Sequence, residues 1–258
     1  MTTHVHVTRA AENAAIQILT VDRPPRNAMT LECYRQLLAA LQAGHLDTGI
    51  ECVILTGAGD KAFISGGDLN EHAALDAQSA QLRTTLIRQV FDTVRRHRAP
   101  VIAAVNGYAL GGGLALMASC DIAIASTNAK FGLPEVKVGI MGGTKHLARI
   151  VPSQVARWMA LTGRFVDAEH FLRLGALQEV VPPAELMAAA IRTAQEICQS
   201  SPSAIRLMKE TLNLTEAMPL DDGYQAECLA TAIMKSLPDG KEAVQAMLEK
   251  RTPNYQRG

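Results

Sequence analysis

Two glycine-rich turns carry the residues of this 258-residue sequence that could do chemistry together. The first is Ser65-Gly66-Gly67-Asp68, and the second is Gly111-Gly112-Gly113, where a helix is expected to start. Glycine lets a ligand approach the main chain closely, and the first N–H groups of a helix have no partner within it. Two such turns at the ends of neighbouring strands can direct two N–H donors at one oxygen. That arrangement is an oxyanion hole, which stabilises an enolate or a tetrahedral anion.

Tight turns without any chemistry are the alternative explanation of these glycines. Either turn alone fits that explanation better, whereas the two turns together favour the oxyanion hole. A third glycine pair, Gly57 and Gly59, also follows a predicted strand. Position 62 is alanine, however, where a dinucleotide-binding loop would have its third glycine, so no nucleotide cofactor is predicted there.

The elements that must position these turns follow an α/β pattern. Strands are expected at 16–21, 52–56, 101–106 and 121–126, and helices at 31–43, 79–97 and 113–119. After about residue 143 the pattern becomes helical, with segments at 154–161, 167–174, 183–199, 203–214, 220–235 and 240–250, each with a proline near its start or an apolar periodicity. We therefore expect an α/β body over 1–195 and a helical region over 196–258 that docks on the body or on a neighbouring subunit.

Composition limits the classes of function. Hydrophobic residues make up 48% of the chain and charged residues 19%, and 25 basic residues balance 25 acidic ones. No global field favours nucleic acid, and no apolar run is long enough to span a membrane. The five cysteines are scattered without metal-ligand spacing, so neither a metal site nor a disulfide framework is predicted. Residues 1–10 do not have the character of a signal peptide, which favours a cytoplasmic location.

Several runs resemble the enoyl-CoA hydratase/isomerase (crotonase) superfamily. They are Ala62-Phe-Ile-Ser-Gly-Gly-Asp68, the run from Pro100 through Asn-Gly-Tyr-Ala-Leu-Gly-Gly-Gly113, Cys120-Asp-Ile122, Phe131-Gly-Leu-Pro-Glu135, Arg23-Pro24 with Asn27-Ala28, and Glu249-Lys-Arg251. The resemblance implies an α/β, crotonase-like spiral of ββα units with a C-terminal helical trimerisation region. It also implies a homotrimer or a dimer of trimers, an acyl-CoA thioester as substrate, and no cofactor beyond the coenzyme A of that substrate.

The resemblance also implies the roles of individual residues. The N–H groups of Gly67 and Gly112 would hold the thioester oxygen, and Glu135 would transfer protons. The residues expected to contact the substrate are Arg26, Ala28, Ser65, Gly66, Asp68, Leu69, Tyr108, Gly111 and His146. Lys250 or Arg251 is expected near the nucleotide phosphates. The acyl group is expected beside Leu75, Leu86, Val90, Met141 and Trp158.

The sequence departs from typical hydratases of this family at one acid. Those enzymes have a second glutamate two residues after the triple glycine, where this chain has Ala115. A single carboxylate suffices to move a double bond, because it removes a proton at one carbon and returns it at another. Hydration usually uses two carboxylates around one water. Isomerisation and hydration therefore both stay open, with Glu71, His72 and His146 as candidates for a substitute acid.

Other activities also stay open. Thioester hydrolysis or carbon–carbon cleavage would use Glu135 to activate a water, and the altered loop at 139–146 is compatible with either. A homologue that binds CoA or RNA without catalysis is the alternative from a different class. The retained Glu135 and the absence of a dense lysine run argue against that alternative.

Overall fold

The strands of the chain form two sheets. This computed structural model describes residues 2–255. The first sheet has six strands in the order β1-β2-β3-β5-β7-β10, with β1 antiparallel to β2 and the remaining pairs parallel. They span Val5–Arg9, Ile16–Val21, Cys52–Gly57, Val101–Val105, Ile122–Ser126 and Glu179–Val181. The second sheet has the order β4-β6-β8-β9, in strands Ala62–Ile64, Tyr108–Leu110, Lys130–Gly132 and Phe165–Asp167.

A ββα unit repeats three times along the chain and links these sheets. The pairs β3–β4, β5–β6 and β7–β8 each place their first strand in the six-stranded sheet and their second in the four-stranded sheet. Helical segments follow each pair: α2 (Leu69–Ala73) and α3 (Ala77–Arg95), then α4 (Gly112–Met117), then α5 (Thr144–Ile150) and α6 (Ser153–Thr162). The predicted α/β spiral of ββα units is therefore confirmed.

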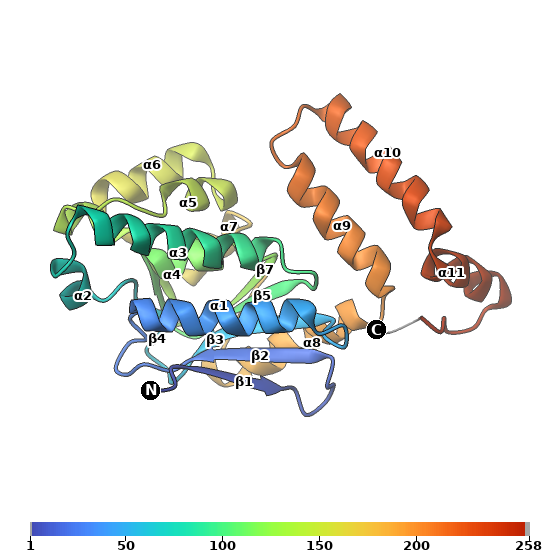
Figure 1. Cartoon of the computed structure of the whole chain (residues 1–258), viewed down its shortest axis with the longest axis horizontal. Helices are drawn as coiled ribbons and strands as arrows, with labels where there is room; N and C mark the ends of the chain where they lie inside the picture. Colours follow the sequence, from blue (N-terminus) through green and yellow to red (C-terminus); the bar gives the residue numbers. More distant parts are fainter. Residues whose placement is uncertain (1, 256–258) are drawn as a thin grey trace.

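Helices cover both faces of the six-stranded sheet (Figure 1). Helix α1 (Leu31–Leu46) and α3 lie side by side on one face, and α8 (Leu186–Cys198) packs on the other. Short segments complete the body: the 3₁₀ turns η1 (Pro134–Val138) and η2 (Pro183–Glu185) and helix α7 (Ala168–Arg173). Among the described residues, no helix combines the length and the apolar character needed to cross a bilayer.

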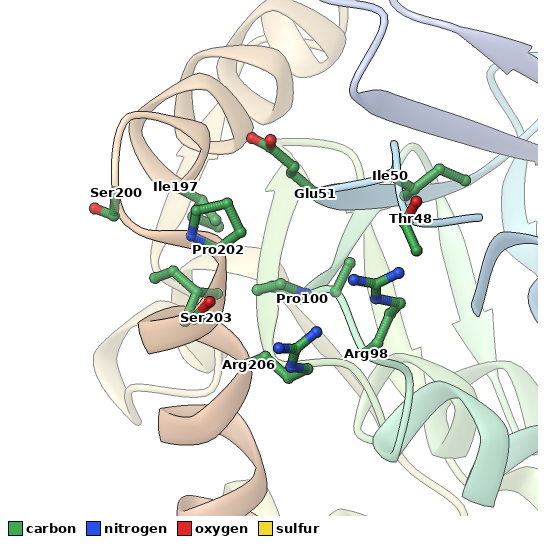
Figure 2. A pocket seen from close by; sticks show the side chains of 12 residues that line it. Thr48, Ile50, Glu51, Arg98, Pro100, Ile197, Ser200, Pro202, Ser203 and Arg206 are labelled. Carbon is green, nitrogen blue, oxygen red and sulfur yellow. The ribbon is translucent and has the colours of Figure 1, made fainter. Parts of the chain in front are cut away.

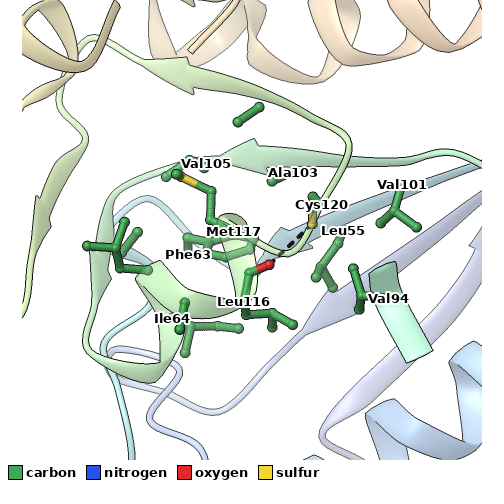
Figure 3. Packing of buried hydrophobic residues seen from close by; sticks show 14 of the residues in the cluster. Leu55, Phe63, Ile64, Val94, Val101, Ala103, Val105, Leu116, Met117 and Cys120 are labelled. Atoms are coloured by element: carbon green, nitrogen blue, oxygen red, sulfur yellow. Dashed lines mark hydrogen bonds between the residues drawn. The ribbon is translucent and has the colours of Figure 1, made fainter. Parts of the chain in front are cut away.

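The buried apolar residues hold α4 in place, which matters because α4 begins in the triple glycine. Figure 3 shows Leu116 and Met117 of α4 among Leu55, Phe63 and Val105. The Cys120 thiol donates to the Leu116 carbonyl oxygen at 3.4 Å, beside the same cluster. Each large side chain buried in this way contributes about 1.5–3 kcal/mol to folding, so α4 is fixed firmly against both sheets.

Three C-terminal helices extend from the body: α9 (Pro202–Thr215), α10 (Leu220–Ser236) and α11 (Pro238–Glu249) (Figure 1). The buried Lys209 attaches α9 to the body, because its Nζ lies 2.7 Å from Asp121 Oδ2 and also donates to two main-chain carbonyls. A second contact is made by Glu216, whose carboxylate bridges Arg95 and Arg149 at 2.5 and 2.6 Å.

Most predicted elements are observed close to their expected bounds, but the strands of the second sheet are not among the predictions. The glycine turn expected at 65–68 directly follows β4. The helix expected from 79 starts at Ala77, because Asp76 caps it and pairs with Ser79 in a capping box. The strands of the second sheet have three residues each, which is too short to show an alternating pattern in the sequence.

Candidate active site

The two glycine turns meet at one edge of the four-stranded sheet. Strands β4 and β6 are parallel, so their C-terminal ends lie together and the turns that follow them come into contact. A Cβ added to Gly66 would lie 3.4 Å from the Leu110 carbonyl oxygen, and one added to Gly113 would overlap the Ile64 carbonyl. Gly66 has φ +105°, a conformation that glycine adopts readily. The backbone conformation therefore requires glycine at position 66, and the close approach requires it at position 113.

The N–H groups of Gly67 and Gly112 are available to a ligand. Neither donates a hydrogen bond to any residue in the described range 2–255, and both residues are partly accessible. Their neighbours are paired: the Gly111 N–H donates to Gly132 at 2.9 Å, and the Asp68 N–H donates to Met29 at 3.0 Å. Paired neighbours fix the orientation of the two unpaired donors, as an oxyanion hole requires.

Glu135 places a carboxylate beside this pair of turns. It lies in η1, directly after β8, and its Oε1 packs so closely on Gly111 that a Cβ at that position would overlap it. Its Oε2 is buried and has no hydrogen-bond partner among the described residues. Burial raises the pKa of Glu135 above its usual range. A carboxyl group with this pKa holds and releases a proton more readily near neutral pH than an exposed glutamate does.

The loop over 139–143 passes beside Ala115. Ala115 is buried in α4, and a Cβ added to Gly143 would lie 3.6 Å from its methyl group. The same added atom would lie 3.5 Å from the Gly111 carbonyl oxygen, so this loop passes directly over the start of α4. Ala115 supplies no second acid at this position.

The candidates for a substitute acid have other contacts. Both carboxylate oxygens of Glu71 accept the Leu31 N–H, at 3.1 and 3.0 Å, at the start of α1. The His146 ring packs edge-on against Phe91 with 5.0 Å between ring centroids, and burial lowers its pKa. No hydrogen bond or ion pair joins His146 to Glu135 in the described part of the chain. His72 is half-buried in α2.

The segment predicted to contact coenzyme A is fixed to the first glycine turn. The Arg23 guanidinium donates to the Ala28 carbonyl at 3.0 Å and to Asp68 Oδ2 at 2.8 Å, and the Ser65 N–H donates to the Arg26 carbonyl at 3.3 Å. Asp68 also caps α2, which lowers the pKa of its carboxyl group chiefly through the Glu71 N–H. The Arg26 side chain is exposed beside this turn, as is Leu69.

The remaining predicted contacts are spread more widely. Tyr108 is partly exposed and its ring contacts Phe165 edge-on, with 6.4 Å between centroids. Met141 is 91% exposed, whereas Val90 is buried in the core and Leu86 packs against that core. Trp158 lies beside Arg164 and His170. The substrate contacts assigned to these residues stay predictions.

Two side chains beside the glycine turns have no counterpart in the sequence-based predictions. A Cβ added to Gly112 would lie 2.9 Å from the Tyr34 hydroxyl, and one added to Gly67 would overlap Nη2 of Arg83. Arg83 could have been noticed in the sequence, because its spacing places it on the same face of the helix as Val90 and Val94, which are buried. A charged residue on an apolar stripe is a reason to look for a partner.

A small hollow at the N-terminal ends of β3 and β5 is separate from these residues (Figure 2). Arg98, Arg206 and Glu51 are among the residues that line it, and its volume is about 50 Å³. Ligand sites usually measure about 300–1,000 Å³, so this hollow is too small to compete as the site.

Two free N–H donors and one desolvated carboxylate on a ββα spiral define an enzyme scaffold suited to enolate chemistry. The family model described as enoyl-CoA hydratase/isomerase matches residues 11–258. The chain belongs to this family, and it is an acyl-CoA enzyme of the crotonase fold.

Individual relatives agree with this placement. The chain is 36% identical to a short-chain-enoyl-CoA hydratase of Clostridium acetobutylicum over 240 residues, covering 92% of each chain. It is 36% identical to a carnitinyl-CoA dehydratase of Salmonella enteritidis over 265 residues, covering 98% of each. Its fold matches the crystal structure of an enoyl-CoA hydratase from Bacillus anthracis with a TM-score of 0.94 at 33% identity, covering 99% of this chain and 100% of that one.

Proposed function

We propose that this protein catalyses the reversible hydration of an enoyl-CoA, with Glu135 as its acid/base and the N–H groups of Gly67 and Gly112 as its oxyanion hole. The observation that carries this proposal is the buried, unpartnered Oε2 of Glu135 on a carboxylate that touches the second glycine turn. The hydratase and dehydratase names of relatives at 36% identity support the choice of reaction.

One carboxyl group can complete this reaction because it has two oxygens. Water adds to C3 of the enoyl group while the electrons of the double bond move to the thioester oxygen, where the two N–H groups stabilise the charge. The protonated oxygen of Glu135 gives its proton to C2, and the other oxygen accepts a proton from the water. The carboxyl group is regenerated, and dehydration follows the same steps in reverse. The raised pKa of Glu135 favours the protonated form that begins hydration.

Double-bond isomerisation is the second candidate, and Ala115 favours it. With no carboxylate at that position, nothing from α4 holds a second proton-transfer group over the acyl chain. Glu135 would remove a proton from C2 of a 3-enoyl-CoA and return it to C4 through a dienolate held by the same two N–H groups.

Coenzyme A is proposed to lie along the segment that contains Arg26 and Ala28 and along the first glycine turn. Arg26 is exposed beside Ser65, and a guanidinium there suits a phosphate. The main chain of Ala28 and Gly66 and the side chain of Leu69 would flank the thioester arm. Thioester hydrolysis and carbon–carbon cleavage would use the same binding mode with a different acyl group.

The C-terminal region 196–258 is proposed to form a homotrimer or a dimer of trimers. Large apolar side chains on α9, α10 and α11 are exposed in the single chain: Met208, Leu212, Leu214, Leu220, Tyr224, Leu229, Ile233, Val244, Met247 and Leu248. Apolar surface of this extent usually marks an interface. Sedimentation equilibrium should give a mass three or six times that of the 27.6 kDa chain, and a monomer at micromolar concentration would refute the proposal.

The test of the reaction is a comparison of three substrates. Crotonyl-CoA reports hydration through loss of its conjugated absorbance, 3-hydroxybutyryl-CoA reports the reverse reaction, and 3-hexenoyl-CoA reports isomerisation through gain of conjugation. We expect turnover of the first two. Turnover of 3-hexenoyl-CoA alone would replace hydration by isomerisation, and binding of CoA esters without any turnover would leave only a non-catalytic role.

A further inference from the structure

Arg83 brings a guanidinium to the first oxyanion donor without a hydrogen-bond partner. Its Nη2 lies so close to Gly67 that a Cβ added there would overlap it, and its side chain is only 11% exposed. None of its N–H groups makes a hydrogen bond within residues 2–255, and its Nε is buried. The nearest carboxylate is Glu71, whose Oε2 lies 3.8 Å from that Nε, which is beyond hydrogen-bond length.

Tyr34 brings a hydroxyl to the second oxyanion donor. The residue is 1% exposed, and its oxygen lies 2.9 Å from the position of a Cβ added to Gly112. The Arg83 guanidinium stands over the Tyr34 ring at 5.9 Å from its centroid. Burial raises the pKa of Tyr34 to about 12, against the opposing effect of Arg83, so the hydroxyl keeps its proton and acts as a donor.

The two side chains thus place one donor beside each glycine of the proposed oxyanion hole. The Nε of Arg83 is buried without a hydrogen bond, which is unfavourable because its transfer out of water is not compensated. The planar fork of the guanidinium matches a carboxylate, which accepts two parallel N–H bonds. In the proposed complex Gly67 and Gly112 hold the thioester oxygen, so a group bound by Arg83 and Tyr34 lies close to it, and we place that group on the acyl half of the substrate.

We propose that the acyl group carries a carboxylate, which the Arg83 guanidinium and the Tyr34 hydroxyl bind, so that the substrate class is a short dicarboxylic enoyl-CoA. This inference rests on the proposed acyl-CoA site but not on the choice between hydration and isomerisation. The purely structural alternative is that Arg83 only ties α3 to the ring of Tyr34 and to Glu71.

Matched substrates separate these explanations. Glutaconyl-CoA is crotonyl-CoA with one hydrogen of the terminal methyl group replaced by a carboxylate. We expect the wild-type protein to have the higher kcat/KM with glutaconyl-CoA. Arg83→Met should lower kcat/KM for glutaconyl-CoA by about 10- to 100-fold, the range for a hydrogen bond to a charged group, and change crotonyl-CoA less than about 3-fold. Tyr34→Phe should lower the ratio of kcat/KM for glutaconyl-CoA to kcat/KM for crotonyl-CoA by about 5-fold.

Two controls address folding and charge. Arg88→Met makes the same change at an exposed position of α3, so it should leave both substrates unaffected. Arg83→Lys keeps the charge but loses the planar fork, so it should retain part of the preference for glutaconyl-CoA. Thermal melting of each variant shows whether it folds. If Arg83→Met does not fold, the Arg83→Lys and Tyr34→Phe proteins decide the question.

Binding of saturated thioesters distinguishes failure of this inference from failure of the proposed reaction. Glutaryl-CoA and butyryl-CoA cannot be hydrated or isomerised, so calorimetry measures their affinities without turnover. Tighter binding of glutaryl-CoA that needs Arg83 supports the inference even if no enoyl-CoA reacts. Equal affinities, or equal losses for both thioesters in Arg83→Met, would overturn it even if crotonyl-CoA is hydrated rapidly.

Discussion

Replacement of Glu135 by glutamine tests the central claim about the chemistry. Glutamine has nearly the shape of glutamate, so the contact with Gly111 is preserved while the proton-transfer group is removed. A positioned acid/base contributes about 10²–10⁴-fold to rate, which corresponds to about 2.7–5.4 kcal/mol of transition-state stabilisation. We therefore expect kcat for the preferred enoyl-CoA to fall by at least about 100-fold, with KM changed little.

The same substitution should not destabilise the fold. The folded-state pKa of Glu135 is raised by burial, so this residue contributes stability below its unfolded-state pKa, and that contribution is lost as pH rises through the folded-state value. Above the folded-state pKa the ionised side chain is unfavourable in its buried position. Glu135→Gln should therefore have an unfolding free energy equal to or above that of the wild type at pH 7.

The assay combines steady-state kinetics with urea unfolding of both proteins. The pH dependence of unfolding should also differ, because the wild-type protein loses stability relative to the variant as pH rises from acid toward neutrality. A variant that keeps more than about a tenth of the wild-type kcat would refute the role of Glu135. So would a loss of activity that is fully explained by unfolding.

Three further changes test neighbouring parts of the structure. Gly111→Ala should abolish activity because its Cβ would overlap Glu135. Gly59→Ala is the control: Gly59 also has a positive φ but has open space around it, so this change should only lower the unfolding free energy by about 1–2 kcal/mol. Ala115→Glu should raise hydration of crotonyl-CoA, by up to about 100-fold, if a second carboxylate is all that α4 lacks. Lys209→Met should lower the unfolding free energy by about 1.5–3 kcal/mol, because it removes the hydrogen bonds that the Lys209 ammonium makes to Asp121 and to two main-chain carbonyls.

Each of these predictions has a result that contradicts it. Equal kcat values for the alanine variants at positions 111 and 59 would mean that the contact with Glu135 is unimportant. A folded Ala115→Glu protein with unchanged hydration would show that the loop over 139–143 excludes the water-activating position. An unfolding midpoint of Lys209→Met in urea equal to that of the wild type would mean that the attachment of α9 does not depend on these hydrogen bonds.

The sequence predicts the parts of the fold whose signals are local. Strand β2 coincides with the expected 16–21 because its β-branched residues are bounded by a proline-rich segment. Thr30 caps α1 by accepting the Cys33 N–H, a role for which threonine before an apolar helical segment is a local signal. Glu135 was found through the family motif in which it lies. Signals of this kind depend on a few neighbouring residues, so they can be recognised without knowledge of tertiary contacts.

Long-range contacts are what sequence reasoning missed. Arg83 and Tyr34 lie 49 positions apart, on helices whose faces could be predicted but whose mutual packing could not. The three-residue strands of the second sheet form because each has a partner strand, and no local pattern marks them. Glu71 illustrates the opposite case, since a residue considered as a spare acid is committed to the start of α1.

The geometry at Gly111 explains why one glycine supports both halves of the proposed chemistry. Its φ of +55° turns the chain so that the Gly112 N–H begins α4 without a partner, and its missing side chain leaves the room that Glu135 Oε1 occupies. Any other residue at this position would move the oxyanion donor or the carboxylate, and the distance between them would change. The donor and the acid/base are therefore positioned by the same residue, so substitutions there should impair both functions together rather than one at a time.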